Sequence, residues 1–463
     1  MPIHELKSFV ETIFPLYRSI CSPGLDEALE RIKSRFIPDL TIEKYPTRSS
    51  AWTWTLPQKW ELKEGYIESN GKKVIDIKDE PLSVWSGSLP VDGVVSHEEL
   101  IPHIYTDPSR PDLLCWYFKY YGNLSWGFNL PYNLVKTLDP KAKYQVKIDA
   151  RYYDDSFRVG SVFVKGKSDK IILLTSDICH PFQCNDSLSG AAVNYKLYTF
   201  LKTRENDYSY LFTFVPETIG TIAFLANHES LLPHMVYHIY SEFWGRKKNV
   251  RLQKSLRGDS LLDQIASQVL TRRFGGQCKI LKFREDGIMN DELVTSMPNL
   301  YIPSIAFLRE TFEEYHSHKD IPEKLDYDCI EEGYQIIKEV IERIDEAGEV
   351  NHEREKGSLR LEKMFDPFPH DARNFIPVPL FKGPVFLSRY DLWVDWRIDP
   401  KLNAAIDMMM ACMDGKNSVA AIASYVDLPF EKVLGYINKF EEQGLIRKKS
   451  INSNESLYEM GKN

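Results

Sequence analysis

The stretch from residue 171 to residue 190, IILLTSDICHPFQCNDSLSG, constrains the fold of this chain more than any other. It begins with an apolar run of the kind that forms a strand buried on both faces. A polar turn follows, and then a helical apolar pattern. An α/β sheet uses this order to present ligands or catalytic groups at the carboxyl ends of its strands. The turn carries His180 and Asp186, whose imidazole and carboxylate suit a divalent metal. The alternative is a solvated loop before an ordinary helix.

Size and composition limit the classes of protein to consider. A chain of 463 residues is too long for one core, so two or three domains are expected. The net charge of −8 argues against a general binder of nucleic acid. The seven cysteines are scattered without a C-x-x-C pair, which fits a cytoplasmic location. No stretch approaches the ~18 consecutive apolar residues of a membrane span, and the first residues lack the apolar core of a signal peptide.

Composition and the pattern of predicted strands and helices divide the chain into four parts. Alternating strand and helix patterns predict an α/β domain with a mostly parallel sheet flanked by helices, formed by residues 1–40 and 151–346. Residues 41–150 are rich in Trp, Tyr, Pro and Gly and predict an inserted antiparallel β domain. Residues 347–385 have the composition of a linker or arm. In residues 386–463, three helices precede a possible hairpin of LIRKKS with LYEM, an order typical of a winged-helix domain.

Four further groups of chemistry-bearing residues lie at or soon after the ends of predicted strands: Glu217, Glu242, Asp291-Glu292 and His316. Because the carboxyl ends of parallel strands meet at one edge of a sheet, we expect these side chains to approach His180 and Asp186. Hydrolysis at a metal needs about three to five N and O ligands, an open coordination position and a nearby carboxylate base. A lone His or Glu is more often structural or solvated, so the joint pattern carries the prediction.

The motifs HPFQCNDSLSG, VPETIGT, NDE and YHSHKD, in this order, resemble the aminopeptidase-like domain of bacterial proteins related to the zinc-dependent di-metal exopeptidases. FPLYRSICSPGLDEAL resembles the opening segment of that family, and the tail resembles its C-terminal winged helix. The resemblance implies a zinc-exopeptidase-like fold with one or two Zn ions. It also implies metal ligands at His180, Asp186, Glu242 and His316, with Asp186 bridging two metals.

The same resemblance implies roles for the remaining candidates. Glu217 corresponds to the general base. Asp291 and Glu292 correspond to polar residues that line the substrate cleft, and Asp320 to a residue that orients His316. Asp177, three residues before His180, either compensates for the Asp that is absent two positions after His180 or is itself the ligand.

The sequence departs from the exopeptidase pattern at three places, one of them after Glu242, where Phe243-Trp244 stands in place of the expected acidic, glycine-rich stretch. The exopeptidases usually carry Glu-Glu, one residue as base and its neighbour as ligand, but Glu217 is flanked by Pro216 and Thr218. Phe182 stands where an Asp often follows the first ligand His. These departures leave both the number of metals and the presence of activity open.

The sequence therefore predicts a metal-dependent hydrolase of amide bonds, exopeptidase-like, acting on a peptide or an N-acyl small molecule. One alternative is a non-catalytic binding or scaffold protein on a degraded peptidase fold. Another is a regulator that uses the winged helix. Its candidate recognition helix, however, sets Lys432 and Lys439 against three glutamates, so no nucleic-acid partner is expected. We expect no membrane association, and a homo-oligomer is compatible with the sequence.

Overall fold

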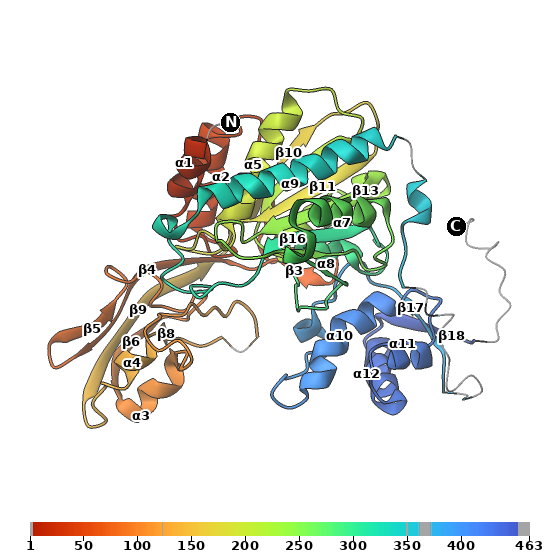
Figure 1. Ribbon diagram of the computed structural model, residues 1–463. Helices are drawn as coiled ribbons and strands as arrows, with labels where there is room; N and C mark the ends of the chain where they lie inside the picture. Colours follow the sequence, from red (N-terminus) through yellow and green to blue (C-terminus); the bar gives the residue numbers. More distant parts are fainter. Residues whose placement is uncertain are drawn as a thin grey trace.

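The computed structural model of the protein describes residues 3–122, 124–348, 351–359, 361, 371 and 373–451 (Figure 1). Its centre is an eight-stranded sheet in the order β1-β10-β12-β11-β13-β16-β14-β15. The strands are β1 Thr41–Pro46, β10 Ser156–Val164, β11 Ile171–Asp177, β12 Ser209–Val215, β13 Met235–Glu242, β14 Val250–Gln253, β15 Lys279–Leu281 and β16 Ser304–Arg309. The four central strands β12, β11, β13 and β16 are parallel, whereas β1, β10 and β14 join antiparallel to their inner neighbours.

The apolar run of β11 explains why this strand lies at the centre of the sheet. All seven of its residues are buried. Because side chains alternate along a strand, Ile172 and Leu174 enter the core on one face, and Ile171 and Leu173 enter the core on the other. The prediction of a mostly parallel sheet with buried strands is confirmed.

Helices cover both faces of the sheet. The first core packs it against α1 Ile3–Ile13, α2 Pro23–Arg35, α5 Leu188–Lys202, α7 Leu261–Phe274 and α9 Tyr327–Glu346. The second core packs it against α6 Ile219–Asn227 and α8 Asp291–Ser296. Short 3-10 turns connect these elements: η2 Glu229–His234, η3 Gly275–Gln277, η4 Pro322–Lys324 and η5 His352–Arg354. Helices on both faces leave the carboxyl edge of the sheet as the open side.

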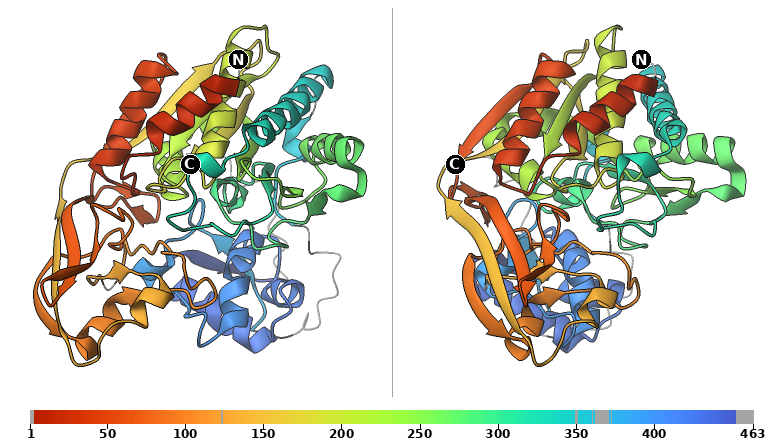
Figure 2. Two further views of the ribbon diagram at one scale, coloured as in Figure 1. Left: turned by 60° about the vertical axis from the view of Figure 1, so that its left-hand side comes forward. Right: turned by 90° about the vertical axis from the view of Figure 1, so that its left-hand side faces the viewer.

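A second lobe, which we call the β lobe, projects from one end of the large sheet (Figure 2). Its four-stranded antiparallel sheet has the order β5-β4-β9-β6 and its own core. Its elements are β4 Lys59–Ser69, β5 Lys72–Asp76, β6 Val91–Ser96, α3 His97–Leu100, η1 Ile101–His103, β7 Ile104–Tyr105, β8 Phe128–Asn129, α4 Tyr132–Val135 and β9 Lys143–Tyr153. The small hairpin of β2 Ser50–Ala51 and β3 Trp54–Thr55 precedes it. Strand β1, within the stretch assigned to the β insert, pairs instead with β10 of the large sheet.

The C-terminal module lies beside the β lobe, below the large sheet in Figure 1. It contains β17 Ile376–Pro379, η7 Leu387–Tyr390, α10 Pro400–Cys412, α11 Val419–Tyr425, α12 Phe430–Glu442 and β18 Ile446–Lys449. Strand β18 pairs with β17, which comes from the stretch expected to be a linker. The predicted partner LYEM lies outside the described residues. In the described part of the chain, no helix has the length and apolar character needed to cross a membrane.

Candidate active site

The loop between β11 and α5 is clamped from two sides by buried charged groups. The guanidinium of Arg18, which is fully buried, donates to the carbonyls of Ile178 and Gln183, each at 2.7 Å. On the other side, the carboxylate of Asp320 accepts the backbone N–H groups of three consecutive residues, Cys184, Asn185 and Asp186, at 3.0–3.2 Å. Charge-assisted hydrogen bonds of this kind fix a loop firmly, so His180 and Asp186 are held in place.

Two imidazoles and a carboxylate converge at this edge of the sheet. Nδ1 of His180 lies 3.6 Å from Oδ1 of Asp186, and Nε2 of His316 lies 3.1 Å from Oδ2 of the same carboxylate. One ligand atom from each of the three residues lies within 4.8 Å of the others. His and Asp are ordinary ligands of zinc, so this donor set fits a divalent metal. Because the two oxygens of Asp186 face different imidazoles, the set is compatible with one ion or two.

The protonation states of this group also suit a metal. Burial lowers the pKa of His180 to about 4, so its imidazole is neutral near pH 7, the form that coordinates a metal. Burial alone would raise the pKa of Asp186, but the neighbouring imidazoles of His180 and His316 more than offset this and hold it below its usual value. The carboxylate is therefore ionised.

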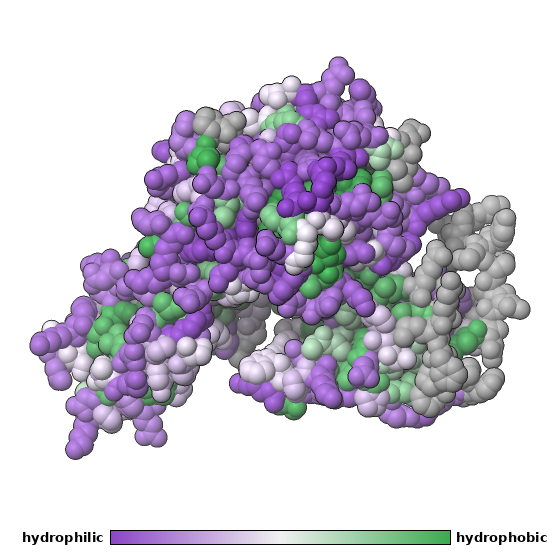
Figure 3. Space-filling model, viewed as in Figure 1, coloured by the Kyte–Doolittle hydropathy of each residue, from purple (hydrophilic) through white to green (hydrophobic). Residues whose placement is uncertain are grey.

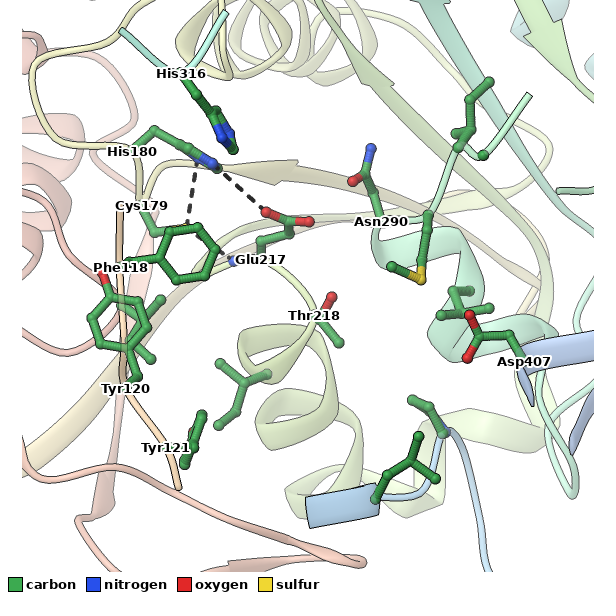
Figure 4. A pocket seen from close by; sticks show the side chains of 18 of the residues that line it. Phe118, Tyr120, Tyr121, Cys179, His180, Glu217, Thr218, Asn290, His316 and Asp407 are labelled. Atoms are coloured by element: carbon green, nitrogen blue, oxygen red, sulfur yellow. Dashed lines mark hydrogen bonds and ion pairs between the residues drawn. The ribbon is translucent and has the colours of Figure 1, made fainter. Parts of the chain in front are cut away.

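Glu217 lies at the end of β12, directly opposite His180 (Figure 4). Its Oε2 is 3.8 Å from Nε2 of His180, and the side chain keeps a third of its surface exposed. Its backbone N–H donates to Sγ of Cys179 at 3.3 Å, and the next N–H, of Thr218, donates to Oδ1 of Asp291 at 2.8 Å. Burial, reinforced by the negative charges of neighbouring carboxylates, raises the pKa of Glu217 well above its ordinary value. A raised pKa makes the carboxylate a better proton acceptor.

Glu242 ends β13 and faces the same space, but it does not belong to the three-residue group found among the described residues. Its carboxylate accepts the hydroxyl of Tyr240 at 2.9 Å and the side-chain amide of Asn290 at 2.7 Å. Burial and the neighbouring acids raise its pKa well above its ordinary value. The predicted ligand Glu242 therefore lines the cavity of the imidazoles, with its carboxylate held by Tyr240 and Asn290.

Three predicted residues lie beneath the site. Asp177 is buried and accepts the hydroxyl of Tyr240 at 2.7 Å. Asp291 and Glu292, expected to line the cleft, are fully buried at the start of α8. That expectation needs correction, because all six residues of this short helix pack inward, and Asn290 is the residue of the NDE motif that faces the cavity. Burial raises the pKa of Asp291 to about 6 and that of Glu292 to about 7.

Asp320 also differs from its predicted role. Its carboxylate holds the backbone of the Asp186 loop, as described above, rather than orienting His316. Asp320 lies four residues after His316, and its two carboxylate oxygens are taken up by these backbone N–H groups. Asp320 therefore acts on the metal group through Asp186.

The site opens into a cavity of about 1210 Å³ whose walls come from three parts of the chain. One wall is the sheet edge with His180, Glu217 and His316. The second is the aromatic run of the β lobe, residues 116–121, and the third comes from the C-terminal module. Figure 3 shows the hollow between the two lower lobes. The residues of the second and third walls were not among the site residues predicted from the sequence. The run WYFKYY was the available signal, but aromatic residues are also typical of a core.

The large, mostly parallel sheet flanked by helices matches the aminopeptidase-like α/β fold of solved structures. The zinc aminopeptidase BSAP from Bacillus subtilis aligns with a TM-score of 0.57 at 14% identity, covering 76% of this chain and 96% of that one. A crystal structure described as a "putative peptidase" from Clostridium acetobutylicum aligns with a TM-score of 0.70 at 26% identity, covering 96% of both chains.

Sequence comparison identifies the family. The family described as "Domain of unknown function (DUF4910)" matches residues 7–347, and the chain belongs to it. A relative from Clostridium acetobutylicum, described as a "Putative polysaccharide biosynthesis protein with aminopeptidase-like domain", is 32% identical over 344 residues, which are 74% of this chain and 78% of the relative. The expected resemblance to aminopeptidase-like domain proteins is confirmed.

Proposed function

We propose that this protein is a zinc-dependent hydrolase of amide bonds, exopeptidase-like in its action. The observation that carries the proposal is the convergence of His180, Asp186 and His316 to within 4.8 Å at the carboxyl edge of the sheet. The aminopeptidase-like fold supports the hydrolase class. A scaffold built on a degraded peptidase fold would have no need to keep these three side chains together, and their convergence favours the enzyme.

Different residues of the site have different roles in amide hydrolysis. His180, Asp186 and His316 would hold the ion, and Glu242, which lines the same cavity, is proposed as a further ligand. A bound Zn²⁺ would act as a Lewis acid toward water and toward the amide carbonyl. Glu217 accepts the proton of the attacking water on its carboxylate and returns it to the nitrogen of the leaving amine. Burial keeps the pKa of Glu217 raised, which suits it to both transfers.

The shape of the cavity supports a substrate that enters by one end. Its lining comes from three parts of the chain, an enclosure that suits a peptide terminus or an N-acyl small molecule better than the middle of a folded polypeptide. The volume of about 1210 Å³ exceeds the ~300–1,000 Å³ of common small-molecule sites. A substrate larger than a single amino acid amide therefore fits, and the name of the Clostridium relative makes a sugar-bearing amide one candidate.

The test is metal analysis combined with turnover. The purified full-length protein is loaded with Zn²⁺, dialysed and assayed for bound metal, and then for hydrolysis of a panel of aminoacyl and N-acyl amides. We expect one or two zinc ions per chain and hydrolysis of at least one substrate class. A protein that retains no zinc and cleaves nothing under zinc-replete conditions would overturn the proposal.

We propose that the C-terminal module does not bind DNA. Three of the basic side chains on and beside α12 are paired with acids: Lys432 with Asp399 at 2.6 Å, Arg373 with Glu431 at 2.8 Å and Lys448 with Glu441 at 2.5 Å. Phosphate binding requires a stripe of available cations. A salt-sensitive shift of duplex DNA by the full-length protein would contradict this.

A further inference from the structure

The C-terminal module is fastened to the rest of the molecule next to the cavity. Phe386 stacks on Trp54 with ring centroids 4.7 Å apart and meets the edge of Tyr121 at 4.8 Å. Nε1 of Trp54 donates to the carbonyl of Pro384 at 2.8 Å, and the guanidinium of Arg389 donates to the carbonyl of Thr53 at 3.1 Å. These contacts join the module to the β2–β3 hairpin and to the aromatic run of the β lobe.

The module also shares a hydrophobic core with the large-sheet domain. Phe283, Leu293 and Met297 pack in one cluster with Ile406 and Met410 of α10. At the border of this cluster, Arg284 forms an ion pair with Asp407 at 2.9 Å, and the hydroxyl of Tyr301 donates to the carbonyl of Ala411 at 3.1 Å. A shared core makes the module a fixed part of the cavity rather than a domain on a free linker.

Aromatic rings of the β lobe and of the C-terminal module line this cavity and remain partly exposed. Phe118 of the β lobe lines it and is 44% exposed; Trp393 of the C-terminal module lines it and is 53% exposed. Phe386 and Tyr121 line the same cavity. Phe118 stacks on Tyr120 with ring centroids 5.5 Å apart, yet it and Trp393 both keep part of their surface open. Another ring placed against this open surface gains from apolar burial and favourable geometry.

We propose that Phe118 and Trp393 form a second subsite of the cleft, which holds a ring with an apolar face carried by the substrate. The ring is an aromatic side chain or a sugar ring attached to the amide that is cleaved at the imidazole edge. This inference rests on the proposed hydrolase function and adds its substrate class. It also assigns the C-terminal module a role in selectivity, because Trp393 belongs to that module.

The experiment compares ring-bearing and ringless substrates. The zinc-loaded full-length protein is assayed with Ala-Ala, Phe-Ala, Ala-Phe and N-alanyl glucosamine. We expect at least one ring-bearing substrate to have a kcat/KM about tenfold above that of Ala-Ala. In Trp393→Ala and Phe118→Ala, the ratio of kcat/KM for the ring-bearing substrate to kcat/KM for Ala-Ala should fall toward one. The main cause should be a higher KM for the ring-bearing substrate. The phenylalanine and glucosamine arms tell the two kinds of ring apart.

Trp396 provides a matched control. It lies in the same segment as Trp393 and is 61% exposed, but it does not line the cavity. Trp396→Ala should therefore keep the full preference for the ring-bearing substrate. Equal loss of selectivity in Trp393→Ala and Trp396→Ala, or no loss in Trp393→Ala, would overturn the subsite.

Binding separates failure of the subsite from failure of the hydrolase. The preferred ring-bearing compound and Ala-Ala are titrated calorimetrically into the Glu217→Gln protein, where cleavage is slow. Tighter binding of the ring-bearing compound, weakened about tenfold by Trp393→Ala, supports the subsite even if the wild type cleaves nothing. Equal affinities for both compounds would overturn the subsite while leaving the hydrolase proposal intact.

Discussion

Nε2 of His316 lies 3.1 Å from Oδ2 of Asp186, although one residue follows β16 and the other follows β11. The two strands are not neighbours, since β13 lies between them. Both loops nevertheless rise from the same carboxyl edge, so their side chains meet above it. This meeting of an imidazole and a carboxylate underlies the proposed metal group.

Removing either imidazole should empty the proposed metal group. In His180→Ala or His316→Ala, only two of the three converging residues remain, and we expect zinc bound after dialysis to fall to less than a tenth of the wild-type content. Elemental analysis of the dialysed proteins measures this. His234→Ala serves as the control, because His234 is exposed and pairs with Asp169 away from the cavity. Full zinc retention by both variants would contradict the assignment.

Glu217→Gln should remove proton transfer while leaving the imidazoles and Asp186 intact. Loss of a positioned general base typically costs 10²–10⁴-fold in rate, so we expect kcat to fall by about that factor with zinc content unchanged. Parallel metal analysis and kinetics on one preparation provide the measurement. If zinc is lost together with turnover, Glu217 is a ligand and its role as base cannot be separated.

Asp320→Asn should loosen the loop that carries Asp186. The amide offers one acceptor oxygen in place of two, so buried N–H groups of residues 184–186 lose a partner. We expect unfolding to become easier by about 1–3 kcal/mol and zinc affinity to fall about 10–100-fold. Denaturant unfolding of the zinc-free protein and zinc titration measure the two effects.

Asp326→Asn is the matched control for that substitution. Asp326 caps the N-terminus of α9 with its carboxylate, and Asn is nearly as good an N-cap as Asp. Zinc affinity equal to the wild type in Asp320→Asn would show that the clamp on the loop is dispensable.

His238 should make the protein less stable in acid. It is fully buried, its ring nitrogens contact the hydroxyls of Thr175 and Thr295 at 2.8 and 2.7 Å, and burial lowers its pKa to about 3. Below pH ~6.5 the imidazole of His238 takes up a proton in the unfolded chain but stays neutral in the folded chain until the pH approaches 3. Stability is therefore lost as the pH falls from about 6.5 toward 3, by about 2 kcal/mol at pH 5.

The measurement for His238 is denaturant unfolding at pH 7.5 and pH 5. Other groups titrate in the same range, so the informative quantity is the difference between the wild type and His238→Gln, which has no ionisable group at this position. We expect the wild type to lose about 2 kcal/mol more than the variant between the two pH values. Identical losses would show that folding does not lower the pKa of His238.

The sequence by itself determined where the central strands end and which polar residues follow them. An apolar run that breaks into polar residues specifies a buried strand and its end without reference to the rest of the chain, which is why β11 and β12 and the positions of His180 and Glu217 could be predicted. The mostly parallel sheet follows from the alternation of strands and helices.

Only the tertiary structure decided which of these residues meet and which are covered. Asp291 and Glu292 are buried because α8 packs inward, Asp320 reaches the Asp186 loop, β18 pairs with β17, and the C-terminal module walls the cavity. Each of these outcomes depends on contacts between segments far apart in the chain. Local patterning encodes the type of an element, but the packing of distant side chains sets where it lies and what it faces.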